Sequence, residues 1–208
     1  MKQGSFAFAD KNETELKLPF ADYAYPAKEW NGLVLVGEAP GAEEARLGKP
    51  FVGRSGQLLD KMLGLAGIKR EETLIANVFR FQPPGNKIDY FFSSARAAKT
   101  GGYGVAENYG KFGSGLCRSL YATEIDHLRD TLAHQKPNVV VALGRTPFWA
   151  LTGENGLLEK VGNALPCRLS PSVEVIPTYH PSFILRGNWK LQDAWLGHLE
   201  AARKRLKR

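Results

Sequence analysis

The chain has 208 residues, of which 43% are hydrophobic, and a formal net charge of +7 at pH 7. This length predicts one domain with a sizeable core, spanning residues 1–208. No apolar run approaches the roughly 18 residues that cross a bilayer, and residues 1–22 lack the apolar core of a signal peptide. We therefore expect no membrane partner and an intracellular, cytoplasmic location. The positive charge favours a polyanionic partner, because basic side chains displace the counterions of phosphates.

Four apolar, β-rich runs predict buried strands, and stretches with helical periodicity lie between them. The strands are expected at Leu33–Val36, Leu74–Val78, Val139–Leu143 and Val173–Thr178, and the helices at Gly56–Ala66, Ser119–Ala133 and roughly Leu191–Arg208. This alternation is typical of an α/β fold whose parallel sheet has helices on both faces. Ligands of such sheets bind at the carboxyl ends of the strands, so the residues after each strand are the candidate site.

The first predicted strand ends in Gly37-Glu38-Ala39-Pro40-Gly41, and Glu44 follows. Glycine and proline favour a tight turn in which backbone N–H groups approach a ligand, with carboxylates close by. The loop after it places Phe51 between glycines, immediately before a predicted helix. Phe51 is either a core residue or a platform on which a flat ligand stacks.

The second and fourth predicted strands each lead into a polar side chain. The second carries Asn77, whose amide can both donate and accept a hydrogen bond, as the edge of a pyrimidine requires. An asparagine that caps a turn is the structural alternative. The fourth leads into His180-Pro181, where the proline restricts the backbone and the histidine can direct a hydrogen bond at an oxygen that gains charge.

A segment at about 86–116 interrupts the pattern, with repeated glycines and aromatic residues. We predict a long, mobile insertion. It is either disordered without a role, or its aromatic residues stack on exposed bases or cover the mouth of the site.

Taken together and in this order, these motifs resemble the uracil-DNA glycosylase superfamily. The resemblance covers about residues 30–205, and it is closest to the bacterial and archaeal branch that carries an iron–sulfur cluster. The motifs that carry it are Gly37-Glu38-Ala39-Pro40-Gly41 with Glu44, Pro50 to Leu59, Asn77-Val78 with Pro83-Pro84-Gly85-Asn86, Val141-Ala142-Leu143-Gly144, and His180-Pro181-Ser182. It implies a three-layer α/β/α sandwich with a central four-stranded parallel sheet and DNA bound across the strand ends.

The resemblance also implies a role for each matching residue. Phe51 would stack on an extruded uracil with Ala39 beside it, Asn77 would bind the imide edge of the base, and His180 would stabilise the departing uracil anion. Glu38 and Glu44 would lie near the sugar and the attacking water. We favour Glu44 for the water, although either glutamate could instead accept backbone N–H bonds at the start of a helix. The expected DNA contacts are Arg54, Ser55, Ser182, Leu185 and Arg186, with Leu185 or Arg186 filling the space that the base leaves.

The cysteine content of this chain differs from that of the iron–sulfur branch, which uses four cysteines as cluster ligands. This chain has two, Cys117 and Cys167, and Phe81 stands where the branch carries one. We therefore predict no metal and no cofactor. Instead, we expect apolar packing of the N-terminal segment to replace the cluster as a staple, through Phe6, Phe8, Phe20, Tyr23, Tyr25 and Trp30.

The predicted function is a DNA repair glycosylase that flips uracil out of single- or double-stranded DNA, hydrolyses its N-glycosidic bond and leaves an abasic site. We expect a monomer, associated with the nucleoid if the source is a bacterium. Three alternatives stay open: a protein that binds uracil in DNA without turnover, a glycosylase acting mainly on hypoxanthine or xanthine, and a small-molecule hydrolase on the same fold.

Overall fold

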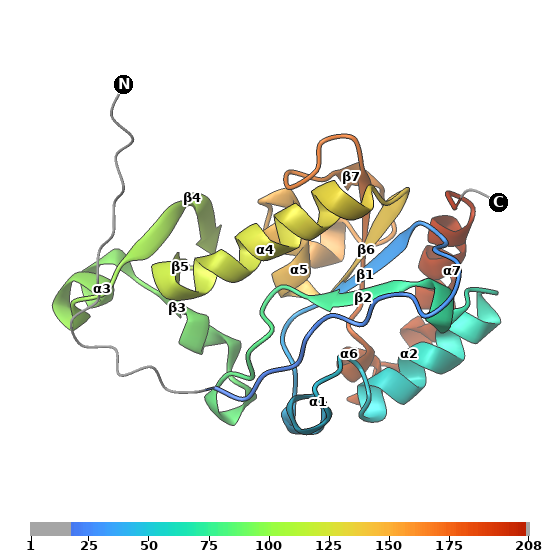
Figure 1. Cartoon of the computed structure of the whole chain (residues 1–208), viewed down its shortest axis with the longest axis horizontal. Helices are drawn as coiled ribbons and strands as arrows, with labels where there is room; N and C mark the ends of the chain where they lie inside the picture. The colour runs from blue at the N-terminus through green and yellow to red at the C-terminus, as the bar shows by residue number, and fades with distance from the viewer. Residues whose placement is uncertain (1–17, 207–208) are drawn as a thin grey trace.

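The computed structural model describes residues 18–206, and a sheet of five strands in the order β2-β1-β6-β8-β7 lies at its centre (Figure 1). The parallel strands are β1 (Leu33–Gly37), β2 (Leu74–Asn77), β6 (Val139–Leu143) and β8 (Glu174–Thr178). These confirm the predicted strands and the α/β class. The sheet is larger than predicted, because β7 (Leu165–Pro166) pairs antiparallel with β8. A strand of two residues that includes a proline leaves no periodic pattern to recognise.

Helices cover both faces of the sheet, because side chains alternate along each strand. Val34 and Val36 belong to one buried cluster with residues of α4 and α5, whereas Leu33 and Leu35 belong to another with residues of α2 and α7. These helices are α2 (Arg54–Leu65), α4 (Ser119–Gln135), α5 (Arg145–Thr152) and α7 (Gln192–Arg203). Burial on both faces explains why the strands are continuous apolar runs in the sequence.

Shorter elements complete the chain, and two of them directly follow strands. Helix α1 (Ala42–Leu47) comes shortly after β1, and α6 (Pro181–Leu185) shortly after β8. The 3-10 turns are η1 (Arg70–Glu72), η2 (Pro84–Asn86), η3 (Ile88–Phe91), η4 (Leu157–Glu159) and η5 (Trp189–Leu191). Within residues 18–206, no helix combines the length and apolar character that crossing a bilayer requires.

The insertion is folded, so the prediction of a long mobile loop was wrong. It contains α3 (Ala95–Gly101) and a small antiparallel sheet of β3 (Phe92–Ser93), β4 (Val105–Phe112) and β5 (Gly115–Arg118). Its aromatic residues form a core: Phe91 is buried, and Phe92 packs edge-on against Trp149 with 5.3 Å between ring centroids. Its glycines form turns and caps, as Gly102 does in the left-handed conformation after α3.

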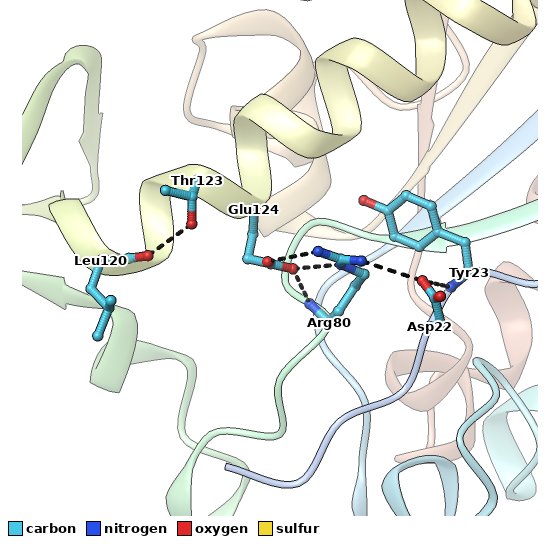
Figure 2. A network of polar contacts seen from close by, with 6 residues as sticks. All are labelled: Asp22, Tyr23, Arg80, Leu120, Thr123 and Glu124. Atoms are coloured by element: carbon cyan, nitrogen blue, oxygen red, sulfur yellow. Dashed lines mark hydrogen bonds and ion pairs between the residues drawn. The ribbon is translucent and has the colours of Figure 1, made fainter. Parts of the chain in front are cut away.

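A network of charged residues ties the segment after β2 to α4 (Figure 2). The Arg80 guanidinium donates to both carboxylate oxygens of Glu124, over 2.8 and 3.0 Å, and the Arg80 backbone N–H donates to the same carboxylate. Arg80 also reaches Asp22 at 3.4 Å. The N-terminal segment pairs with this region through the Ala21 N–H, which donates to the Arg80 carbonyl oxygen. The segment from Asn77 onward is therefore held from two sides.

Candidate active site

The parallel strands bring the predicted site residues to one edge of the sheet. Gly37 pairs with Asn77, and Leu143 pairs with Thr178, so the residues that follow these strands converge. They border a pocket of about 370 Å³. The predicted residues that line it are Glu38, Ala39, Glu44, Phe51, Ser55, Asn77, His180, Ser182 and Arg186. Arg54 and Leu185 do not line it, and Pro83 and Asn86 line it although no role was predicted for them.

Asn77 presents an unused amide to this pocket. It is 3% exposed, and among the described residues no hydrogen bond engages its side chain. A Cβ atom at Gly37 would lie 2.4 Å from Asn77 Oδ1 and 2.6 Å from the Phe51 ring. Only glycine fits at position 37 without moving both groups. Because the amide faces the pocket and has no protein partner there, its hydrogen bonds are available to a ligand that enters.

Phe51 forms one wall, in a strained backbone conformation. Its φ angle of 53° lies in the left-handed region, which is uncommon for a bulky residue. Arg70 holds this turn by donating to the carbonyl oxygens of Pro50 and Phe51, at 3.0 and 3.1 Å. The Phe51 ring centroid lies 5.8 Å from that of His180. A flat ligand against this ring would therefore also approach the imidazole.

His180 is held in one tautomer. Its Nδ1 atom accepts the backbone N–H of Ser182 at 3.1 Å and lies 2.8 Å from Ser182 Oγ. Because Nδ1 accepts, the proton of a neutral ring is on Nε2. Burial, together with the nearby Arg186 cation and against the opposing effect of Glu44, lowers the pKa of His180 to about 4. The residue is therefore a neutral hydrogen-bond donor near pH 7.

Glu38 faces the same pocket from the turn after β1. Thr146 Oγ1 donates to Glu38 Oε2 at 2.5 Å. Burial raises the pKa of Glu38, while the Thr146 hydrogen bond and the cations of Arg145 and Arg186 lower it. Thr146 is 108 positions away in the chain, so only the fold brings it to Glu38. No signal in the sequence points to that contact.

The Glu44 carboxylate accepts a hydrogen bond from the backbone, whereas that of Glu38 accepts one from a side chain. Glu44 Oε1 accepts the backbone N–H of Gly53 at 2.9 Å, which ties α1 to the start of α2. This contact matches the alternative in which one glutamate accepts a backbone N–H near a helix start. Both carboxylates line the pocket, and each accepts one hydrogen bond from the protein.

The donor set does not fit the four-thiolate cluster of the related branch. The chain has two cysteines, and burial raises the pKa of the Cys117 thiol to about 12. Nowhere in residues 18–206 do three or more histidine, cysteine or acidic side chains gather as metal ligands would.

Around Phe81, part of the expected staple lies within the described residues. Phe20 contacts Phe81 with 5.4 Å between ring centroids, and the Arg80 guanidinium lies 5.2 Å from the Phe20 centroid and 5.7 Å from that of Tyr23. The packing is thus aromatic and cationic rather than purely apolar. Trp30 packs against the core, Tyr25 is 51% exposed, and Phe6 and Phe8 lie outside the described residues.

The sequence matches known proteins over most of its length. The family model described as the uracil DNA glycosylase superfamily matches residues 28–201. A type-4 uracil-DNA glycosylase of Thermotoga maritima is 33% identical over 179 residues, which are 85% of this chain and 78% of that protein. Those of Archaeoglobus fulgidus and Pyrobaculum aerophilum are 32% and 31% identical, each over 74% of this chain and over 66% and 68% of their own lengths.

Proposed function

Because this chain belongs to the uracil-DNA glycosylase superfamily, we propose that it releases uracil from DNA by hydrolysing the bond between base and sugar. The observation that carries the proposal is the unused amide of Asn77. It faces a pocket that also holds an aromatic ring and a neutral imidazole donor. A pyrimidine needs these three partners: a face to stack on, an amide for its imide edge, and a donor for its carbonyl oxygen.

Binding requires the base to leave the DNA stack, since its reacting bond is otherwise out of reach. The flipped uracil stacks on Phe51. The Asn77 amide then accepts from N3–H of the base and donates to its O4 atom. A base with an amino group at that position offers a donor where Asn77 also donates, so cytosine is disfavoured.

Cleavage leaves positive charge on the sugar and negative charge on the departing uracil. His180 Nε2–H donates to O2 of the uracil, where the negative charge accumulates, and Glu38 stabilises the sugar cation. A water molecule beside Glu38 bonds to C1′ after the bond from C1′ to N1 breaks, and its proton passes to the carboxylate. The carboxylate then gives this proton to solvent and the uracil anion takes one up from solvent, so the products are uracil and an abasic site.

The surrounding strand is held by the mouth of the pocket. Arg186 and Ser55 line it and are suited to phosphate oxygens, whereas the Ser182 hydroxyl lies between His180 Nδ1 and Arg186 and keeps both in place. Arg54, exposed at the start of α2, extends this contact, and Leu185 at the end of α6 fills the space of the flipped base. One face of a monomer is sufficient for such binding.

The test is cleavage of oligonucleotides that each hold one uracil, with release measured by alkaline scission of the abasic product. We expect release by the native protein and a rate at least tenfold lower for His180→Ala and for Glu38→Gln. His134→Ala and Glu107→Gln change an exposed histidine and an exposed glutamate outside the pocket and should keep the native rate.

Binding without release of any base would overturn the proposal. Oligonucleotides with hypoxanthine or xanthine would then separate a different base preference from binding without turnover. Loss of rate in the two exposed-residue variants would show that the assay reports folding rather than chemistry.

A further inference from the structure

A second hollow, of about 640 Å³, adjoins the pocket that holds the candidate catalytic residues. The two share Glu38, His180, Ser182 and Arg186 in their linings, so they meet along that wall. The second hollow extends toward η4 and the end of β6. None of the roles proposed so far uses this space.

The part of the lining that the first pocket lacks is largely apolar. Leu157 and Tyr179 are almost buried, whereas Leu158 on η4 is 68% exposed, and Phe183 completes the wall. An exposed leucine alone is ordinary. Here it borders a concave surface with an aromatic side chain, which is the kind of surface that a nucleobase face contacts.

The charges divide this hollow into two parts. Arg145 and Arg186 line it, and both are close enough to Glu38 to lower the pKa of that residue. Guanidinium groups there suit the phosphates of a strand that enters the first pocket. Glu159 also lines the hollow, and its carboxylate disfavours a phosphate inside. A nucleotide whose uncharged base lies inside the hollow and whose phosphates lie at the arginines fits both the arginines and Glu159.

We propose that this hollow binds the base of the nucleotide next to the uracil, in an unpaired DNA strand. The inference rests on the proposed function, because the shared wall orients the strand only if uracil occupies the first pocket. A neighbouring base must leave its own pair to enter a hollow beside a duplex, and this cost is absent in a single strand. The hollow therefore makes single-stranded DNA the preferred substrate.

The experiment compares single-stranded oligonucleotides in which the nucleotide on the 5′ or the 3′ side of the uracil is intact or replaced by a tetrahydrofuran abasic analogue. We expect the KM of the native protein to rise at least threefold when the base is missing on one of the two sides. Leu158→Ser should abolish that difference. Leu65→Ser, which changes a comparably exposed leucine on α2 outside the hollow, should preserve it.

Matched duplexes and a binding assay distinguish this inference from the proposed function. In duplex DNA, where the neighbouring base stays paired, Leu158→Ser should raise KM less than it does in a single strand. A native protein that releases uracil with the same KM whichever neighbour is missing would overturn the inference and leave the glycosylase standing. If no uracil is released, anisotropy titrations of the same oligonucleotides test the inference by binding alone. Equal Kd values with and without the neighbouring base would then overturn it as well.

Discussion

Asn77 and Arg80 are three positions apart at the end of β2, but their side chains differ in their interaction partners. The Arg80 guanidinium has Glu124, Asp22 and two aromatic faces as partners. The Asn77 amide has no side-chain hydrogen bond in the described part of the chain. Burial is common to both segments, so the difference is one of partners. The saturated guanidinium holds its segment in place, whereas the unsaturated amide, which faces the pocket, leaves its hydrogen bonds for a ligand.

The largest effect is expected on the saturated side. Glu124→Ala leaves Arg80 partly buried without its main partner and should lower the free energy of unfolding by about 3–5 kcal/mol. Asp130→Ala on the same helix is the control, because that side chain is 74% exposed and should cost below about 0.5 kcal/mol. Urea unfolding measures both. Equal midpoints for the two variants would mean that the network does not hold this segment.

On the unsaturated side, Asn77→Ala should act on turnover rather than stability. We expect kcat/KM for uracil release to fall about 100-fold, equivalent to about 2.7 kcal/mol at 1.36 kcal/mol per factor of ten. The free energy of unfolding should change by less than about 1 kcal/mol, since no hydrogen bond of the folded protein is lost. Steady-state kinetics and urea unfolding on the same preparation test this, and a stability loss as large as that of Glu124→Ala would remove the contrast.

The contrast between these residues is only partly visible in the sequence. Strand ends and motif spacing placed Asn77 and His180 in one pocket, because parallel strands present their carboxyl ends together. Arg80 was not singled out, since its partners lie 44 and 58 positions away and no local pattern links them. Thr146 was missed for the same reason. The insertion was misjudged because glycines at turns and aromatics in a small core resemble the composition of a flexible loop.

The contact between Gly37, Asn77 and Phe51 offers a steric test of the pocket. Gly37→Ala places a methyl group 2.4 Å from Asn77 Oδ1 and 2.6 Å from the Phe51 ring, so both groups must move. We expect a loss of about 1–3 kcal/mol in stability and at least tenfold in kcat/KM. Gly64→Ala on α2 meets no atom within 4 Å and should be neutral or slightly stabilising. Native kinetics in Gly37→Ala would contradict this packing.

The fall of the rate at low pH (the acid limb) should show whether the titration of Glu38 or that of His180 limits activity. Glu38 must be ionised to stabilise the sugar, and burial raises its pKa above the ordinary 4.5. The rate should therefore fall about tenfold per pH unit below a midpoint that lies above 4.5. His180, with a pKa of about 4, is mostly neutral in that range, so the limb is set by Glu38. Measurements of kcat from pH 4.5 to 8, with circular dichroism to confirm folding, test this; a Glu38→Gln variant that keeps the limb would contradict it.

The smallest effect is expected at Arg70, which makes both a surface ion pair and hydrogen bonds to the backbone beside the pocket. It pairs with Asp60 at the surface, where ion pairs contribute below about 1 kcal/mol, and it also holds the carbonyl oxygens behind the strained Phe51 turn. Arg70→Met should raise KM severalfold with kcat nearly unchanged, because a looser Phe51 weakens stacking of the base and leaves Glu38 and His180 in place. Lys69→Met removes a neighbouring exposed ion pair, with Glu72, that does not touch this turn, and should leave KM unchanged. If both variants shift KM equally, the effect comes from surface charge, and Arg70 does not position Phe51.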